Sequence, residues 1–269
     1  MVDRFSSLLV SAPREGVETV RDIAYGHHDR QVLDVFCPGG ANAAPVLMFV
    51  HGGAFVDGHR NRTPEIYSNV LYYFARNGVV GVNVEYRLAP EFRYPSGSKD
   101  VGYAVQWVQA NIGKFGGDPY RIFLVGHSAG AAHAASYAYD RRLQPPGGPG
   151  LSGLIVLSGR VRAEMLPENP NSRKVEAYYG ADSAVHEDAS AVSHVCSESI
   201  PTMIAVAEYE NPLLDVHCAE LFHRLAVAKR CAPRFVWLAG HNHTSAIAHF
   251  NTAEERLGLE MLEFLKLGR

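Results

Sequence analysis

Cysteine is scarce in this sequence, and long hydrophobic runs are missing. The 269 residues include four scattered cysteines, Cys37, Cys196, Cys218 and Cys231. Because no pair has the C-x-x-C spacing of a redox or zinc motif, we expect buried free thiols. No apolar stretch reaches the roughly 18 residues that indicate a membrane span. Residues 1–14 lack the basic start and apolar run of a secretory signal, which predicts a cytoplasmic protein.

A strong charge of either sign is also lacking. The 25 Lys and Arg residues and 28 Asp and Glu residues give a formal net charge of −3, and the basic residues form no dense run. This distribution argues against nucleic acid or an anionic membrane as a partner. We expect a small, neutral or mildly polar ligand, and a chain that acts as a monomer or homodimer.

Short apolar runs alternate with helix-like segments along the chain. Residues 19–25 and 31–36 predict two strands that pair as an antiparallel edge hairpin. Further runs that resemble strands buried on both faces are 46–50, 79–84, 122–125, 154–157, 202–207 and 234–238. Residues 100–114 and 253–267 show helical spacing. The pattern predicts a single α/β domain over residues 1–269, with a mostly parallel sheet flanked by helices on both faces.

Residues 161–200 interrupt the strand rhythm. They are rich in Pro, Asn, Glu and Ser and contain the pair Tyr178-Tyr179. Because long irregular segments are usually functional or disordered, we expect a small cap or lid over a site. The alternative is a surface excursion without a role.

The string Gly126-His127-Ser128-Ala129-Gly130 stands between an apolar strand and an Ala-rich segment, 129–139. A nucleophilic serine needs such a sharp strand-to-helix turn to stand clear of a sheet, and the flanking glycines let the turn pack closely. The alternative is an ordinary Gly-rich turn. The context favours Ser128 as a nucleophile.

A second Gly-containing loop, His51-Gly52-Gly53-Ala54-Phe55, follows the strand at 46–50. Small residues there expose backbone N–H groups. The N–H groups of Gly52, Gly53 and Ala129 are the expected oxyanion hole, and His51 is expected to support the loop. A plain turn capped by His51 is the alternative.

An activated serine needs a base and an acid that orients the base, and in this fold type the acid precedes the histidine. Glu210 is favoured as the acid because it lies in the loop after the strand at 202–207. Asp215 is the second choice, since it is expected to begin a helix, and Glu208 is the third.

Two histidines, His241 and His243, follow the last strand. We favour His243 as the base because it lies deeper in the loop, with His241 in support. An H-x-H pair can also bind a metal, but no third ligand has a recognisable spacing. We therefore expect no metal and no cofactor.

These residues resemble the hormone-sensitive-lipase-like branch of the α/β hydrolases, with an arylformamidase-like or carboxylesterase-like subgroup as the nearer relative. The similar pieces are His51-Gly52-Gly53, Tyr86-Arg87-Leu88-Ala89-Pro90-Glu91 with Tyr94-Pro95, Phe115-Gly116-Gly117-Asp118-Pro119 and the Ser128 turn. Together with the acid and histidine loops they span about residues 30–250. The resemblance implies a Ser128, Glu210 and His243 triad.

The sequence departs from the family where the acid is usually Asp followed by Pro-Leu, because Asn211 holds that place and Glu210 precedes it. The region before the first core strand is also short, which implies a small cap and a small substrate. We expect Arg87 to tie loops together, with substrate contact as the alternative. Candidate substrate-binding residues are Phe55, Tyr86, Tyr178, Tyr179 and His127, although aromatic residues are more often core.

The resemblance implies a serine esterase that cleaves small carboxylic esters through an acyl-enzyme. One alternative keeps the triad and cleaves an aryl formamide such as N-formylkynurenine. Another is a non-catalytic ligand-binding protein on the same fold.

Overall fold

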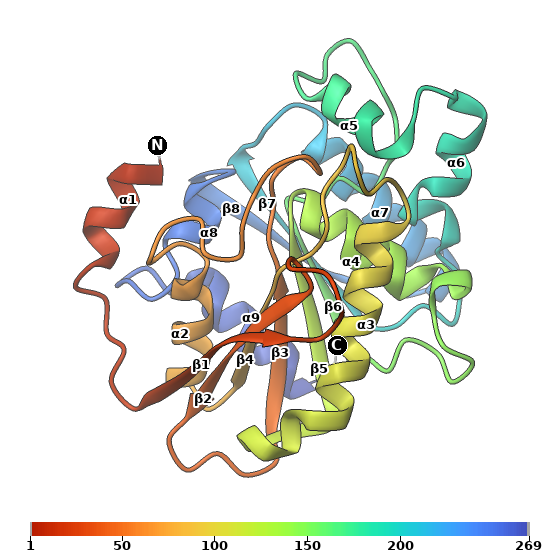
Figure 1. Ribbon diagram of the computed structural model, residues 1–269. Helices are drawn as coiled ribbons and strands as arrows, with labels where there is room; N and C mark the ends of the chain where they lie inside the picture. The colour runs from red at the N-terminus through yellow and green to blue at the C-terminus, as the bar shows by residue number, and fades with distance from the viewer. Residues whose placement is uncertain (1, 268–269) are drawn as a thin grey trace.

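The computed structural model describes residues 2–267 and forms one large sheet with helices on both faces (Figure 1). Met1, Gly268 and Arg269, at the ends of the predicted domain, lie outside the described residues. The strands, in the sheet order β1-β2-β4-β3-β5-β6-β7-β8, are β1 (Val17–Ala24), β2 (Val32–Pro38), β4 (Val80–Val84), β3 (Ala44–Val50), β5 (Gly117–His127), β6 (Gly153–Leu157), β7 (Thr202–Tyr209) and β8 (Arg234–Asn242).

The strand directions agree with the sequence prediction. β1 and β2 form the antiparallel edge hairpin, and β2 runs antiparallel to β4. The remaining neighbours, from β4 through β3 to β8, pair in parallel. Parallel neighbours need crossovers, and helices fill them. The predicted α/β-hydrolase class is therefore confirmed, with each predicted strand observed.

The α-helices are α1 (Val2–Leu9), α2 (Ser68–Arg76), α3 (Ser96–Asn111), α4 (Ala129–Tyr139), α5 (Ser172–Tyr179), α6 (His186–Ala189), α7 (Leu214–Lys229), α8 (Ser245–Ala248) and α9 (Arg256–Leu267). Short 3-10 turns occupy η1 (Ile112–Phe115), η2 (Arg141–Leu143), η3 (Ser183–Val185) and η4 (Ala191–His194). Within residues 2–267, none of these helices has the length and apolar character needed to cross a bilayer.

Alternation along β3 explains the two-layered core. Val46, Met48 and Val50 pack with α3, α4 and α7 on one face of the sheet. Leu47 and Phe49 pack with α2 and α9 on the other face. Because each full burial of such a side chain stabilises the fold by about 1.5–3 kcal/mol, a strand that is apolar on both faces is stable only between two helix layers.

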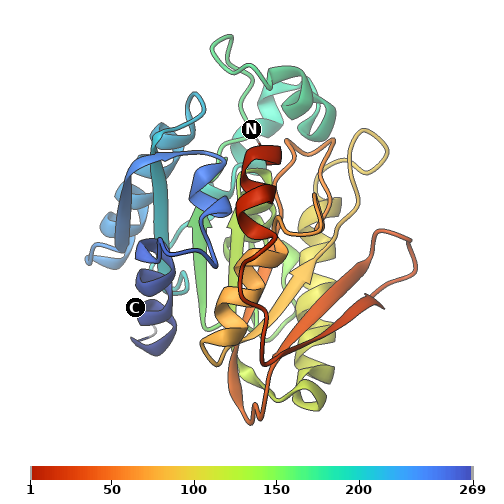
Figure 2. The same cartoon turned by 90° about the vertical axis from the view of Figure 1, so that its left-hand side faces the viewer.

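The segment predicted as a cap contains α5 and α6. Figures 1 and 2 show it at the end of the sheet where β5 runs into α4. That end carries the loops after the parallel strands, where α/β sheets bind ligands.

The cysteine prediction is only partly right. All four are free thiols, but only Cys218 on α7 is buried, and Cys231 is exposed. Cys231 follows the end of α7, in the connection to β8.

Candidate active site

Ser128 is the single residue between β5 and α4. Its backbone angles are φ 58° and ψ −120°, which are rare for a residue with a side chain. Gly130 makes this turn possible, because a Cβ there would lie 2.2 Å from the carbonyl oxygen of Val50. The close approach of β3 and the turn leaves the partly exposed Ser128 at the carboxyl end of the sheet.

Glu210 and His243 meet beside this turn. Nδ1 of His243 lies 2.6 Å from Oε1 of Glu210, whose side chain is 3% exposed. Burial opposes ionisation of Glu210, but its bonds to His243, to the Ser158 hydroxyl and to the Asn211 N–H hold its pKa below the ordinary value. A carboxylate at Nδ1 leaves Nε2 of His243 free to exchange a proton.

The other acid and base candidates lie elsewhere. Asp215 is exposed in the first turn of α7, as the sequence predicted for a helix start. Glu208 is exposed and accepts a hydrogen bond from the N–H of Gly240 at 2.7 Å. His241 contacts Glu254 across 3.5 Å. Of the three carboxylates weighed from the sequence, Glu210 contacts His243.

A pocket of about 240 Å³ lies beside Ser128 and His243. It is lined by Ser128, His243, Gly52 and Gly53, together with His127, Tyr67, Ile66, Ile247, Ala54, Asp57, Arg62, Asn171, Lys174, Asn211 and Thr244. A larger hollow of about 560 Å³ lies between residues 138–149 and 196–200, but no serine–histidine arrangement lines it.

The predicted oxyanion loop runs along this pocket. Gly53 has φ 145°, and a Cβ there would lie 1.8 Å from the carbonyl oxygen of Asp57, so only glycine fits. Gly52 approaches Ser128 closely and is buried, whereas Gly53 is partly exposed along the pocket. Of the two glycines, Gly53 is therefore the more accessible to a ligand.

His51 fixes the start of this loop. Its Nδ1 lies 2.7 Å from the carbonyl oxygen of Gly52, and its Nε2 lies 2.8 Å from Oε1 of Glu85. Tyr86 donates its hydroxyl hydrogen to the carbonyl of His51 at 2.8 Å and stacks on the imidazole. His51 thus has the supporting position expected of it.

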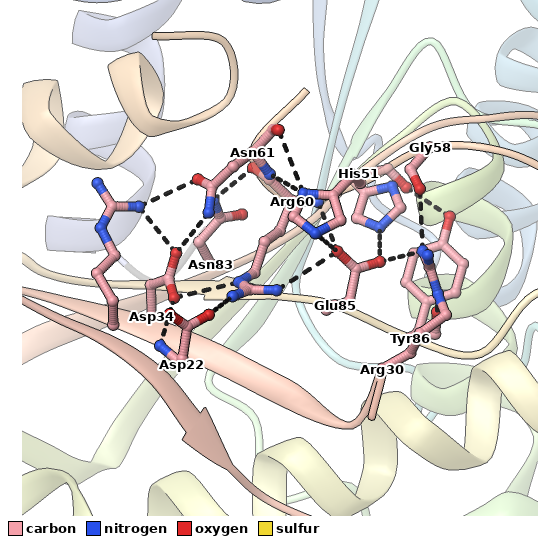
Figure 3. Close-up of polar contacts among 12 residues, drawn as sticks. Asp22, Arg30, Asp34, His51, Gly58, Arg60, Asn61, Asn83, Glu85 and Tyr86 are labelled. Atoms are coloured by element: carbon pink, nitrogen blue, oxygen red, sulfur yellow. Dashed lines mark hydrogen bonds and ion pairs between the residues drawn. The ribbon is translucent and has the colours of Figure 1, made fainter. Parts of the chain in front are cut away.

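A buried ionic network extends from Glu85 (Figure 3). Glu85 pairs with Arg30 and with Arg60, and Arg60 also pairs with Asp34 at 3.1 Å. Burial opposes ionisation of Glu85, but the charge and hydrogen bond of His51, followed by Arg30 and the N–H of Arg60, hold its pKa below the ordinary value. The network joins the hairpin strand β2 to the oxyanion loop.

Arg87 forms the loop clamp that the sequence predicted. It binds the Asp100 carboxylate on α3 through Nε and Nη2, at 2.9 and 2.7 Å. Since Asp100 is buried and also accepts the Arg87 N–H, this pair holds the chain after β4 against α3.

The candidate substrate-binding aromatics divide into two groups. Phe55 lines a narrow recess that also contains Ser128 and Ala129. Tyr178 stacks on Phe55 with ring centroids 4.8 Å apart and is buried, as is Tyr179. Tyr86 is fully buried beneath His51, so Tyr86, Tyr178 and Tyr179 lie behind the walls of the two pockets.

His127 packs directly against His243. Its ring centroid is 4.5 Å from that of His243, and its Nε2 lies 3.1 Å from the His243 carbonyl oxygen, to which it donates. Burial, aided by the charge of His243, lowers the pKa of His127 from 6.5 to about 3. His127 therefore forms a neutral wall of the pocket at physiological pH.

One cluster apart from Ser128, Glu210 and His243 has the composition of a metal site. His241, His249 and Glu254 place their ligand atoms within 4.8 Å of one another. The sequence pattern pairs His241 with His243, but in the structure these two side chains contact different carboxylates, Glu254 and Glu210. Imidazole and carboxylate groups would suit a divalent transition metal.

Sequence reasoning missed three residues at the site. Tyr67 reaches the pocket from a left-handed backbone conformation just before α2, and Arg160 and Asn169 line the recess beside Ser128. No motif marks any of them, because each depends on packing between distant segments.

The chain has recognisable relatives. A family described as alpha/beta hydrolase fold matches residues 47–245. Esterase LipC of Mycobacterium tuberculosis is 29% identical over 242 residues, which is 83% of this chain and 59% of LipC. Esterase LipQ of the same organism is 37% identical over 134 residues, or 46% of this chain and 30% of LipQ. The chain thus spans less than two thirds of these curated relatives.

Solved structures share the fold. Inhibited esterase B from Lactobacillus rhamnosis superposes with a TM-score of 0.81 at 17% identity, over 99% of this chain and 92% of that one. A hyperthermophilic esterase from Pyrobaculum calidifontis superposes with a TM-score of 0.77 at 24% identity, over 98% of this chain and 88% of that one.

Proposed function

Because this chain belongs to the α/β-hydrolase fold family, we propose that it hydrolyses small carboxylic esters through an acyl-enzyme on Ser128. The observation that carries the proposal is the 2.6 Å contact of the buried Glu210 with His243, which lines a pocket together with Ser128. Two of the relatives are named as esterases, which supports ester hydrolysis as the reaction.

The first half of the reaction forms the acyl-enzyme. Oγ of Ser128 attacks the ester carbonyl while Nε2 of His243 takes the hydroxyl proton, and Glu210 stabilises the resulting imidazolium. The N–H groups of Gly53 and Ala129 bind the oxyanion, and such a donor typically contributes about 10²–10³-fold in rate. The C–O bond to the alcohol then breaks, and the alcohol leaves with the proton from His243.

The second half releases the acid. A water molecule gives a proton to His243 as its oxygen attacks the acyl carbonyl. The bond to Ser128 breaks, the serine regains the proton, and the carboxylic acid departs. Both halves use the same groups, so loss of Ser128 or His243 stops the whole cycle.

The size of the pocket supports a small substrate. Its volume of about 240 Å³ lies below the roughly 300–1,000 Å³ typical of sites for drug-sized ligands. Asn171 and Lys174, on the segment predicted as a cap, form part of its wall. This segment limits the length of the substrate.

The test compares hydrolysis of 4-nitrophenyl butyrate by the wild type and by Ser128→Ala. We expect turnover by the wild type and a loss of at least about 10³-fold in the variant. Equal activity in both proteins would show that Ser128 is not the nucleophile. If both proteins are inactive, 4-nitrophenyl butyrate is not a substrate, and an aryl formamide is tested next.

A further inference from the structure

Arg160 is a buried cation without a carboxylate partner among the described residues. It follows β6 and is 6% exposed. Its Nη2 donates to Oδ1 of Asn169 at 3.3 Å, but its buried Nη1 has no partner. The nearby carboxylate Glu164 binds His217 instead, at 2.8 Å. A buried charge without compensation is costly, so such a group usually has a partner that binds it.

Asn169 adds a second unused donor at the same place. It is 3% exposed, and its Oδ1 accepts from Arg160 and from the N–H of Asn171. Its Nδ2 is buried without a partner. Two buried donors that lack an acceptor define a site for an anion or a strong acceptor, because only donors are left unsatisfied.

Arg160 and Asn169 line the narrow recess that contains Ser128 and Ala129. His243 lines the pocket of about 240 Å³, the larger of the two hollows beside Ser128, and not this recess. Since His243 must protonate the departing alcohol, the alcohol belongs on the side of the larger pocket. The recess is left for the acyl part of the substrate.

The charges around the larger pocket agree with an anionic substrate. Arg62 and Lys174 are exposed at its wall, against one exposed carboxylate, Asp57. The net charge of the chain is −3, yet the side chains at this mouth are positive on balance. Such a local excess attracts an oppositely charged ligand.

We propose that Arg160 and Asn169 form an acyl subsite that binds a carboxylate, so that preferred substrates are half-esters of short dicarboxylic acids. The inference rests on the proposed function. The space in the recess is only about 20 Å³, which suits one small group and not a long alkyl chain. Burial lowers the pKa of Arg160, and Tyr179 and Glu164 partly offset this effect.

The first test compares monomethyl succinate with methyl 4-methylpentanoate, in which a branched alkyl end replaces the carboxylate, by methanol release. We expect the wild type to favour the half-ester in kcat/KM. Arg160→Met should lose about 10- to 100-fold on the half-ester alone, the range for a charge-assisted hydrogen bond. Arg160→Gln, which keeps a polar end, provides a second variant should the first not fold.

Arg162→Met is the matched control. It removes the same charge two residues away, from a guanidinium that is already bound by Glu187 and Glu220. We expect it to keep the wild-type preference between the two esters. A preference that is unchanged in Arg160→Met, or lost equally in both variants, would overturn the subsite.

A binding measurement separates the subsite from the catalysis. Free succinate should raise the Tm of Ser128→Ala, and it should not raise that of Ser128→Ala/Arg160→Met. If no ester is cleaved but this Arg160-dependent shift is present, the subsite stands and the proposed function fails. If esters are cleaved and succinate produces no such shift, the subsite is wrong and the proposed function stands.

Discussion

His243 Nδ1 lies 2.6 Å from Glu210 Oε1, although the two residues are 33 positions apart in the chain. The contact forms because β7 and β8 are parallel neighbours, so the loops that follow them emerge at the same edge of the sheet. Of the three carboxylates that the sequence suggested as the acid, this contact favours Glu210.

Replacing the acid tests this selection. We expect Glu210→Gln to lower kcat/KM by about 10³–10⁴-fold, because an amide cannot stabilise the imidazolium and favours the wrong tautomer. Asp215→Asn removes an exposed charge near the same loop and should leave kcat/KM within about twofold of the wild type. A large loss in Asp215→Asn with little change in Glu210→Gln would reassign the acid.

The turn at Ser128 should not tolerate a larger neighbour. A Cβ at Gly130 would lie 2.2 Å from the Val50 carbonyl oxygen, whereas one at Gly113 meets nothing within 4 Å. We expect Gly130→Ala to abolish most activity and to lower the free energy of unfolding by about 1–3 kcal/mol or more, because of strain. Gly113→Ala should match the wild type in urea unfolding and in esterase assays. An active, stable Gly130→Ala would refute this reading of the turn.

Loss of the Glu85 charge should destabilise the protein. Its side chain is 1% exposed and contacts Arg30, Arg60 and His51. Glu85→Gln removes a carboxylate partner from the partly exposed Arg30 and one of the three carboxylate partners of the buried Arg60. Removing one partner of a buried ion pair typically costs about 3–5 kcal/mol in the free energy of unfolding. Chemical denaturation measures this loss, with the exposed Glu91→Gln as the control. A change below about 1 kcal/mol in Glu85→Gln would contradict the account.

Acid should destabilise the fold through two buried histidines. Burial lowers the pKa of His127 and of His133 from 6.5 to about 3. Below pH 6.5 the unfolded chain binds protons that the folded chain does not, so the free energy of unfolding falls as the pH falls toward 3. Each group contributes a slope of about 1.4 kcal/mol per pH unit in this range.

The pH dependence of unfolding in His133→Gln tests that slope. Between pH 6 and pH 5 the variant should lose about 1.2 kcal/mol less than the wild type. The exposed His223→Gln should follow the wild type. Parallel curves for His133→Gln and the wild type would mean that His133 does not carry this pH dependence.

The strands and their directions were predictable because burial on both faces leaves a plain signal. The run Val46–Val50 is apolar at each position, since both of its faces are covered. By contrast, the described N-terminal helix α1 carries no comparable signal, and its Leu9 is buried against the layer that contains α2. Short surface elements of this kind depend on tertiary contacts that a sequence pattern does not display.

The site was predictable to the extent that its residues follow strand ends. Ser128, Glu210 and His243 each come directly after a strand, so parallel topology brings them together. Tyr67, Arg160 and Asn169 carry no such mark. The position of each depends on how distant segments of the chain pack together, which a sequence pattern does not display.

The most direct test of the central claim is the mass of the protein after reaction with diethyl 4-nitrophenyl phosphate, a reagent for activated serines. We predict one diethylphosphoryl group per chain, on the peptide that contains Ser128, and none on Ser128→Ala. His243→Ala should react far more slowly, because no base remains to take the serine proton. Labelling at another residue, or equal labelling of Ser128→Ala, would contradict the proposal that Ser128 is the nucleophile.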